Sequence, residues 1–220
     1  MATLDQFLPW VLPSAVNCPT PLAYQAIKDA AREFCVATNV IQEGSTQAGR
    51  SGRASYTIDE PSGTKLNQVL RVTWEGSTLS PVAAGDVKLA TALRGSVGDA
   101  VVEAGTPRQF YQRTPLDPTI YLWPVPDDKA VNATNGLYIK AAFAPYPAAT
   151  SLPDELFEYY VTAVAAGALA SLLSMPEQPW TNPNMAAINR KTFYASVAKA
   201  KRDALVGLAL ANQRVNGRRF

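Results

Sequence analysis

Prolines and glycines divide this chain into two helix-forming ends and a middle region that is repeatedly interrupted. Residues 21–38 and 153–212 carry apolar side chains at helical spacing, whereas residues 40–147 contain most of the glycines and many of the prolines. Proline removes a backbone donor and stops a helix, so short strands and turns are the structures left to the middle region. The sequence therefore predicts helices at both ends of the chain and strands between them.

The first helix is predicted over residues 21–38. Thr20 is a residue type that can cap a helix, and Pro21 suits the first helical position. Cys35 falls on the apolar side, where we expect a buried structural thiol rather than a reactive one. The apolar positions follow the i, i+3, i+4, i+7 spacing of one helix face. They are Ala23, Ala26, Ile27, Ala30, Ala31, Phe34 and Cys35.

Two further helices are predicted within residues 153–212. The first begins at Pro153 with acidic residues in its first turn and ends before Pro176. A rigid corner follows, in which Asn182 can cap the last helix, expected from residue 184 to about 212. Small residues around Gly167 make the first of these helices thin, so neighbouring helices can approach it closely.

The middle region predicts short strands separated by turns. The gaps between the strands are short, and no helix of crossover length intervenes, so the sheet is expected to be mainly antiparallel. Short helical turns are predicted at 86–94 and 99–104. The expected strands are 54–59, 68–74, 108–113, 119–123 and 137–143.

These elements predict an α+β protein with a single domain over residues 1–220. Its expected architecture is a helical bundle of three main helices (21–38 and 153–212) with an inserted, mainly antiparallel β region (40–147). Prolines interrupt residues 1–20, which are therefore predicted to form an extended N-terminal arm. Residues 213–220 are expected to form a C-terminal arm.

Composition argues against catalysis. The chain has no histidine and only two cysteines, Cys18 and Cys35, and it lacks the glycine-rich, nucleophile-elbow and metal-binding motifs of common enzymes. No catalytic, cofactor-binding or metal-binding residue is therefore predicted. The longest low-polarity run, residues 161–173, is shorter than the roughly 20 residues that cross a bilayer, so no membrane partner is expected.

Charge is distributed unevenly along the chain. The net charge is +2, but residues 187–220 contain eight basic residues and one acidic residue. This excess indicates that the C-terminal end contacts an acidic partner, either protein or nucleic acid. A solvated helix face that keeps the protein in solution is the alternative interpretation.

Several short motifs occur in a distinctive order between residues 18 and 202. Each motif also has an ordinary structural explanation as a cap, a turn or part of a core, so their order and spacing carry the information. The motifs are CPTP at 18–21, AAREFC at 30–35, VLRV at 69–72 before Gly76 and Leu79, Gly-Thr-Pro at 105–107 with Tyr111, IYLWPVP at 120–126, LPD at 152–154 with Tyr160, AGA at 166–168, and PWTN at 179–182 with Arg190 and Phe193.

In this order the motifs resemble the head-to-tail adaptor (connector) proteins of tailed bacteriophages, the group that includes podovirus tail tubular protein A. The resemblance implies a homo-oligomeric ring of about twelve copies that binds the portal protein and presents a platform to the tail or nozzle protein. Genomic DNA would pass through the channel without tight binding. The resemblance also implies a virion protein at the head–tail junction that is made in the host cytoplasm and has no catalytic residues and no cofactor.

The resemblance also suggests roles for particular residues. A C-terminal segment docks on the portal in such proteins, and here Arg214, Arg218 and Arg219 would meet acidic portal surface while Phe220 fills an apolar pocket. Packing between subunits is expected to involve four further residues. These are Tyr160, Gly167, Trp180 and Phe193.

Two other functions remain open. One is a different ring component of a virion, such as a tail terminator or completion protein, which differs from an adaptor in its partner. The other is a DNA-binding module that uses the basic C-terminal helix, which predicts a steep dependence of DNA affinity on salt. An enzyme is the weakest hypothesis, because the chain has no recognisable catalytic constellation.

Overall fold

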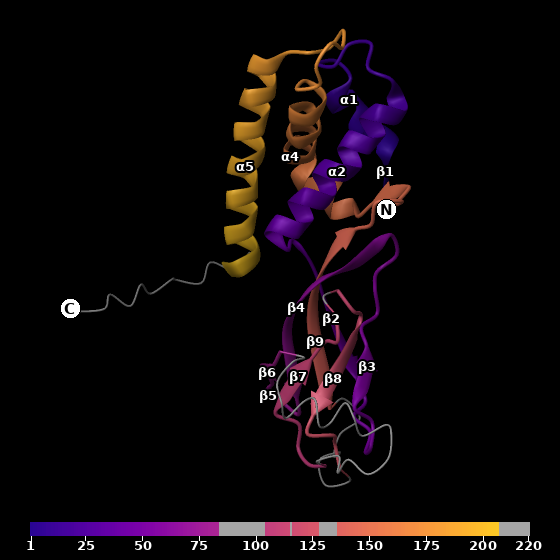
Figure 1. Ribbon diagram of the computed structural model, residues 1–220, viewed down its shortest axis with the longest axis vertical. Coiled ribbons are helices and arrows are strands. Elements are labelled where there is room, and N and C mark those ends of the chain that lie inside the picture. Colours follow the sequence, from indigo (N-terminus) through magenta and orange to yellow (C-terminus); the bar gives the residue numbers. More distant parts are fainter. Residues whose placement is uncertain (84–103, 115, 128–135, 207–220) are drawn as a thin grey trace, which may run out of the picture. The chain divides into compact units, whose positions relative to one another are not determined.

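A computed structural model describes residues 1–83, 104–114, 116–127 and 136–206 (Figure 1). The chain divides into two compact units, each of which is described by itself. A helical unit consists of Met1–Val40 and the chain from Pro145 onward, and a β unit consists of Ile41–Ala144.

The helical unit contains four α-helices among its described residues, together with a two-stranded sheet. Helix α2 is amphipathic, and both α2 and α5 pack against α4. The elements are β1 (Ala2–Thr3), the 3-10 helix η1 (Leu4–Phe7), α1 (Leu8–Val11), α2 (Thr20–Thr38), β10 (Ser151–Leu152), α4 (Asp154–Leu172) and α5 (Pro183–Val206).

The predicted extended N-terminal arm is wrong. Strand β1 pairs with β10, and η1 and α1 follow it directly. The ring of Phe7 packs edge to face on Phe157, with 5.3 Å between ring centroids, and Val11 is fully buried. Pro9 lies in the first turn of α1, where its missing backbone donor costs nothing, so this proline starts a helix instead of interrupting one.

Helix α2 confirms the predicted helix at 21–38. All seven predicted apolar positions are buried, and Cys35 is among them. Thr20 makes no capping hydrogen bond. The helix ends at Thr38 and is capped by Asn39, which has a left-handed backbone (φ 54°) and whose N–H donates to the Cys35 carbonyl at 2.8 Å.

Helices α4 and α5 confirm the two helices predicted to begin near residues 153 and 184. A kink at Tyr160 (φ −130°, ψ 15°) gives the first turns of α4 a different direction from the rest of the helix. Asn182 caps α5 as predicted, because its side-chain oxygen accepts from the N–H of Met185 at 3.1 Å. The predicted extension of the last helix beyond residue 206 lies outside the described residues.

The β unit contains two four-stranded sheets, ordered β2-β9-β4-β5 and β3-β8-β7-β6. The pairs β2–β9, β3–β8, β4–β5 and β7–β8 are antiparallel, and β6 pairs with β7 in parallel. Side chains from both sheets are fully buried, among them Trp74 and Ile139 in the first and Tyr56 and Ile120 in the second. The strands are β2 (Ile41–Gln47), β3 (Ser55–Thr57), β4 (Thr64–Trp74), β5 (Ser77–Thr78), β6 (Ser80–Pro81), β7 (Gln109–Tyr111), β8 (Thr119–Trp123) and β9 (Leu137–Pro145).

The predicted fold, a bundle of three main helices with one inserted β region, is therefore wrong. The described residues form a sheet-rich mixture of α and β structure, with three sheets and ten strands. Strand β2 accounts for much of the difference. Its sequence IQEGSTQ lacks apolar alternation, yet it pairs with β9 from Ile41↔Phe143 to Gln47↔Leu137. The helical turns predicted at 86–94 and 99–104 lie outside the described residues except at Ala104, which bridges to Val125.

Gly167 allows α4 to approach its neighbours closely. A Cβ atom added there would lie 2.8 Å from the ring of Phe193 on α5 and 2.9 Å from the Cβ of Ala30 on α2. Real Cβ atoms do not approach other atoms so closely, and both neighbours are buried. The absence of a side chain at residue 167 therefore sets the spacing of the three helices.

We predict that Gly167→Ala lowers the free energy of unfolding by about 1–3 kcal/mol, although alanine is the better helix former, because the added methyl group overpacks the contact. Denaturant titration measures the change. Ser171→Ala, on the exposed side of the same helix, is the control and is expected to change stability by less than about 0.5 kcal/mol. Equal stability of Gly167→Ala and the wild type would show that Phe193 and Ala30 leave room for a side chain at residue 167.

Candidate functional site

The two thiols are poorly placed to act as nucleophiles. Burial raises the pKa of Cys35, which is completely inaccessible on α2, and burial also raises the pKa of Cys18. A raised pKa keeps the thiol protonated, and the thiolate is the reactive form. Both cysteines are free in the structure, so neither contributes a disulfide.

The part of the chain that the structure describes contains no cluster of three or more residues that could hold a metal ion. Among the same residues, no helix is both long and apolar enough to cross a bilayer.

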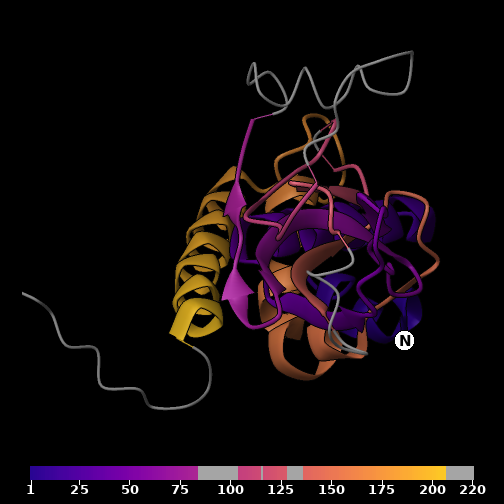
Figure 2. The same cartoon turned by 90° about the horizontal axis from the view of Figure 1, so that it is seen from below.

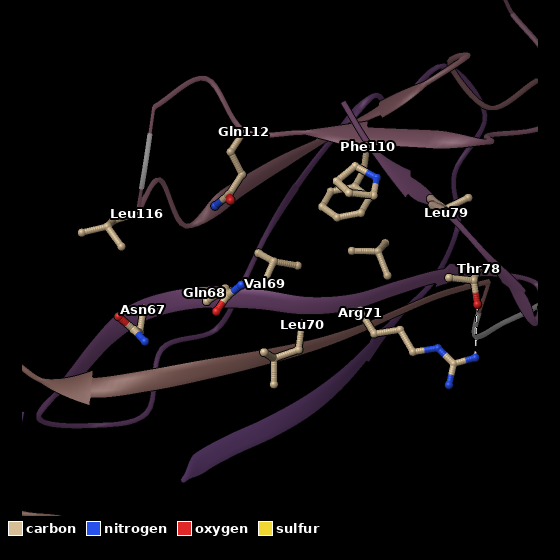
Figure 3. A pocket seen from close by; sticks show the side chains of 12 residues that line it. Asn67, Gln68, Val69, Leu70, Arg71, Thr78, Leu79, Phe110, Gln112 and Leu116 are labelled. Carbon is tan, nitrogen blue, oxygen red and sulfur yellow. Dashed lines mark hydrogen bonds between the residues drawn. The ribbon is translucent and has the colours of Figure 1, made fainter. Parts of the chain in front are cut away.

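The β unit has a groove of about 520 Å³ between β4 and the strands β6 and β7 (Figure 3). Phe110 points from β7 toward Val69 on β4, and Leu116 lies at one end. The guanidinium of Arg71 donates to the hydroxyl of Thr78 at 3.2 Å. The lining residues include no carboxylate or thiol, so the groove has mixed apolar and polar walls and no acid–base pair.

The helical unit instead presents an uncovered helix face. Ala186, Phe193 and Ala200 bury one side of α5 against α4 and α2, and α5 runs along one edge of this unit in Figures 1 and 2. The opposite side of α5 is exposed, and we call it the basic face. Its residues follow the i, i+3, i+7 spacing of one helix side. They are Ile188, Lys191, Ala195, Ala198 and Arg202.

A second exposed surface lies at the start of α4 and is here called the acidic patch. It consists of Glu155, Glu158 and Tyr159, which the i, i+3, i+4 spacing places on one side of the helix. Tyr159 is 72% exposed, unusually high for an aromatic side chain. The kink at the next residue, Tyr160, sets the direction of these turns, and the Tyr160 ring packs on Phe34 with 5.0 Å between centroids.

The four residues predicted to pack between subunits make contacts within one chain. Phe193 is 3% exposed and contacts Gly167, while Tyr160 is half-buried against Phe34. Trp180 is also buried, and its indole N–H has no hydrogen-bond partner among the described residues. Their role between subunits stays a prediction. The residues predicted to dock on the portal, Arg214, Arg218, Arg219 and Phe220, lie outside the described residues.

Sequence reasoning missed the exposed side chains that make the helical unit suitable for association. Ile188 and Tyr159 are not among the candidate residues of the sequence analysis, yet both are largely exposed to solvent. The sequence carries no clear signal for this, because the side of α5 that is buried, at Ala186, Phe193 and Ala200, depends on where α4 and α2 pack. Ile188 lies well outside that buried side.

No protein-family model matches the chain, and no curated protein sequence matches it. The resemblance to phage adaptors therefore stays a prediction that depends on the order and spacing of short motifs.

The buried Cys35 thiol predicts a pH dependence of stability. The unfolded chain releases the thiol proton above its usual pKa of about 9, whereas the folded chain retains it, so stability is lost as pH rises above that value. Relative to Cys35→Ala, the wild type should lose up to about 1.4 kcal/mol of unfolding free energy per pH unit above pH 9. Denaturant titrations between pH 7 and 10 measure this difference. If the unfolding free energies of the wild type and Cys35→Ala changed equally with pH, the raised pKa of the Cys35 thiol would be contradicted.

Proposed function

We propose that this protein is a structural subunit of a ring that joins the portal of a tailed-phage capsid to the tail and leaves a channel for DNA. The observation that carries the proposal is the basic face of α5, a long helix that the described residues cover on one side only. A subunit that closes into a ring needs such surface for its neighbours. The order of the sequence motifs supports an adaptor in particular.

Exposed large side chains support association. Trp10 on α1, Tyr159 on α4 and Ile188 on α5 are each at least half exposed, at 50%, 72% and 57%. Aromatic residues are enriched at protein–protein interfaces, and burying such side chains against a partner is favourable. The helical unit therefore has apolar surface available for neighbouring subunits or for the portal.

Two of the motifs position helices of the helical unit. Leu152 is fully buried at the end of β10, and Asp154 accepts from the N-terminal ammonium at the start of α4. In the corner before α5, the Thr181 hydroxyl donates to the carbonyl of Met175, and Asn182 caps the helix. These residues fix where two of the helices start.

The proposed partners are the portal protein, a tail or nozzle protein, and further copies of this chain. We assign the protein no catalytic activity and no cofactor, and its place is the head–tail junction of the virion. A tail terminator or completion ring would use the same kind of surfaces and differs only in which protein it binds.

The cations of α5 favour a second candidate, a DNA-binding module. The helix carries five basic residues and one acidic residue, and the described part of the chain forms no ion pair with those bases. A phosphate-binding helix loses affinity steeply as salt increases, whereas an adaptor that only lets DNA pass does not bind tightly. A salt-titrated DNA-binding curve separates the two.

We predict that the full-length protein forms a stoichiometric complex with the portal protein encoded by the same genome. Native mass spectrometry of the protein alone and after mixing with portal measures the copy number. A complex with a tail-tube protein but not with portal would favour the terminator, and tight, salt-sensitive DNA binding without portal binding would favour the second candidate.

Removal of residues 213–220 should weaken portal binding at least about tenfold, because the proposed docking segment contributes three arginines and a phenylalanine. The matched control is Arg214, Arg218 and Arg219 changed to lysine, which keeps the charge. Unchanged portal affinity of the truncated protein would contradict the docking role without affecting the ring proposal.

A further inference from the structure

We propose that the basic face of α5 in one copy of this chain contacts the acidic patch at the start of α4 in the next copy. The inference rests on the proposed ring and names the two surfaces that join its subunits. Both surfaces belong to the helical unit, so the inference depends only on the geometry of that unit.

Charge complementarity is the first argument. Lys191 and Arg202 are exposed on the basic face, and Glu155 and Glu158 are exposed in the acidic patch. Within the part of the chain that the structure describes, none of the four forms an ion pair. Opposite charges on two surfaces steer their encounter and select one register, even when each exposed pair contributes little affinity.

Exposed apolar surface is the second argument. Ile188 on the basic face is 57% exposed, and Tyr159 in the acidic patch is 72% exposed. Ala195 and Ala198 lie between the cations, so a partner can approach the helix backbone closely there. Burial of Ile188 and Tyr159 would supply affinity that the ion pairs alone do not.

The positions of the two surfaces favour a head-to-tail contact. Figure 1 shows α5 along one edge of the helical unit, while β10, which leads directly into α4, pairs with β1 on the other side of α2. A two-fold dimer through α5 would place Lys191 and Arg202 against the same cations of its partner, which is unfavourable. Contact between two different surfaces instead propagates around a ring.

Paired charge reversals test the contact. One variant carries Lys191→Glu and Arg202→Glu, and the other carries Glu155→Lys and Glu158→Lys. All four residues are exposed, so both variants are expected to fold, which circular dichroism and thermal melting verify. Each variant alone should self-associate at least about tenfold more weakly than the wild type, because like charges then face each other.

An equimolar mixture of the two variants should restore assembly to within about threefold of the wild type. In the mixture, each reversed face meets the oppositely reversed face of its neighbour, so subunits alternate and native mass spectrometry should detect them in a one-to-one ratio. The matched control is Arg190→Glu with Lys201→Glu, which makes the same charge change on another side of α5 and should assemble like the wild type.

The outcomes separate this interface from the proposed function. If the wild type does not self-associate alone or with portal, the ring is wrong and the interface with it. If wild-type rings form and survive both reversals, or if the mixture fails to restore assembly, the ring stands and the interface is overturned. If the α5 reversal lowers DNA affinity and leaves assembly unchanged, the basic face contacts nucleic acid and the interface is likewise overturned.

Discussion

Close packing of three helices around Gly167 is the constraint on which the helical unit depends. The missing side chain at this residue lets Phe193 of α5 and Ala30 of α2 approach α4 from two directions. Phe34 then contacts both Phe193 and Tyr160, so aromatic rings connect all three helices. With α5 held this way by one narrow stripe, its remaining surface is left for other contacts.

Local signals in the sequence predicted those elements whose own residues determine them. Helix α2 was predictable because its apolar stripe is regular, and α5 because Asn182 and Pro183 mark its start. Residues 1–20 were misread because proline has the same sequence signature whether it interrupts a helix or starts one. Strand β2 has almost no signal of its own, since its formation depends on pairing with β9, about 95 residues away.

The candidate site could be predicted only in part, for a related reason. The basic excess of the C-terminal end is visible in composition, but which side of α5 is exposed depends on where α4 and α2 lie. Apolar residues on a helix suggest a core, and Ile188 and Tyr159 do not differ in sequence from residues that are buried. The contact of Phe193 with Gly167, 26 residues earlier, is equally invisible in the sequence.

The kink at Tyr160 has a consequence for the size of any ring built through the start of α4. Twelve subunits require a rotation of about 30° between neighbours, and thirteen require about 28°. The first turns of α4 take their direction from the kink, so a bend change of only a few degrees there spans that difference. The packing of Tyr160 on Phe34, a contact within one chain, would then help to set the number of subunits in the ring.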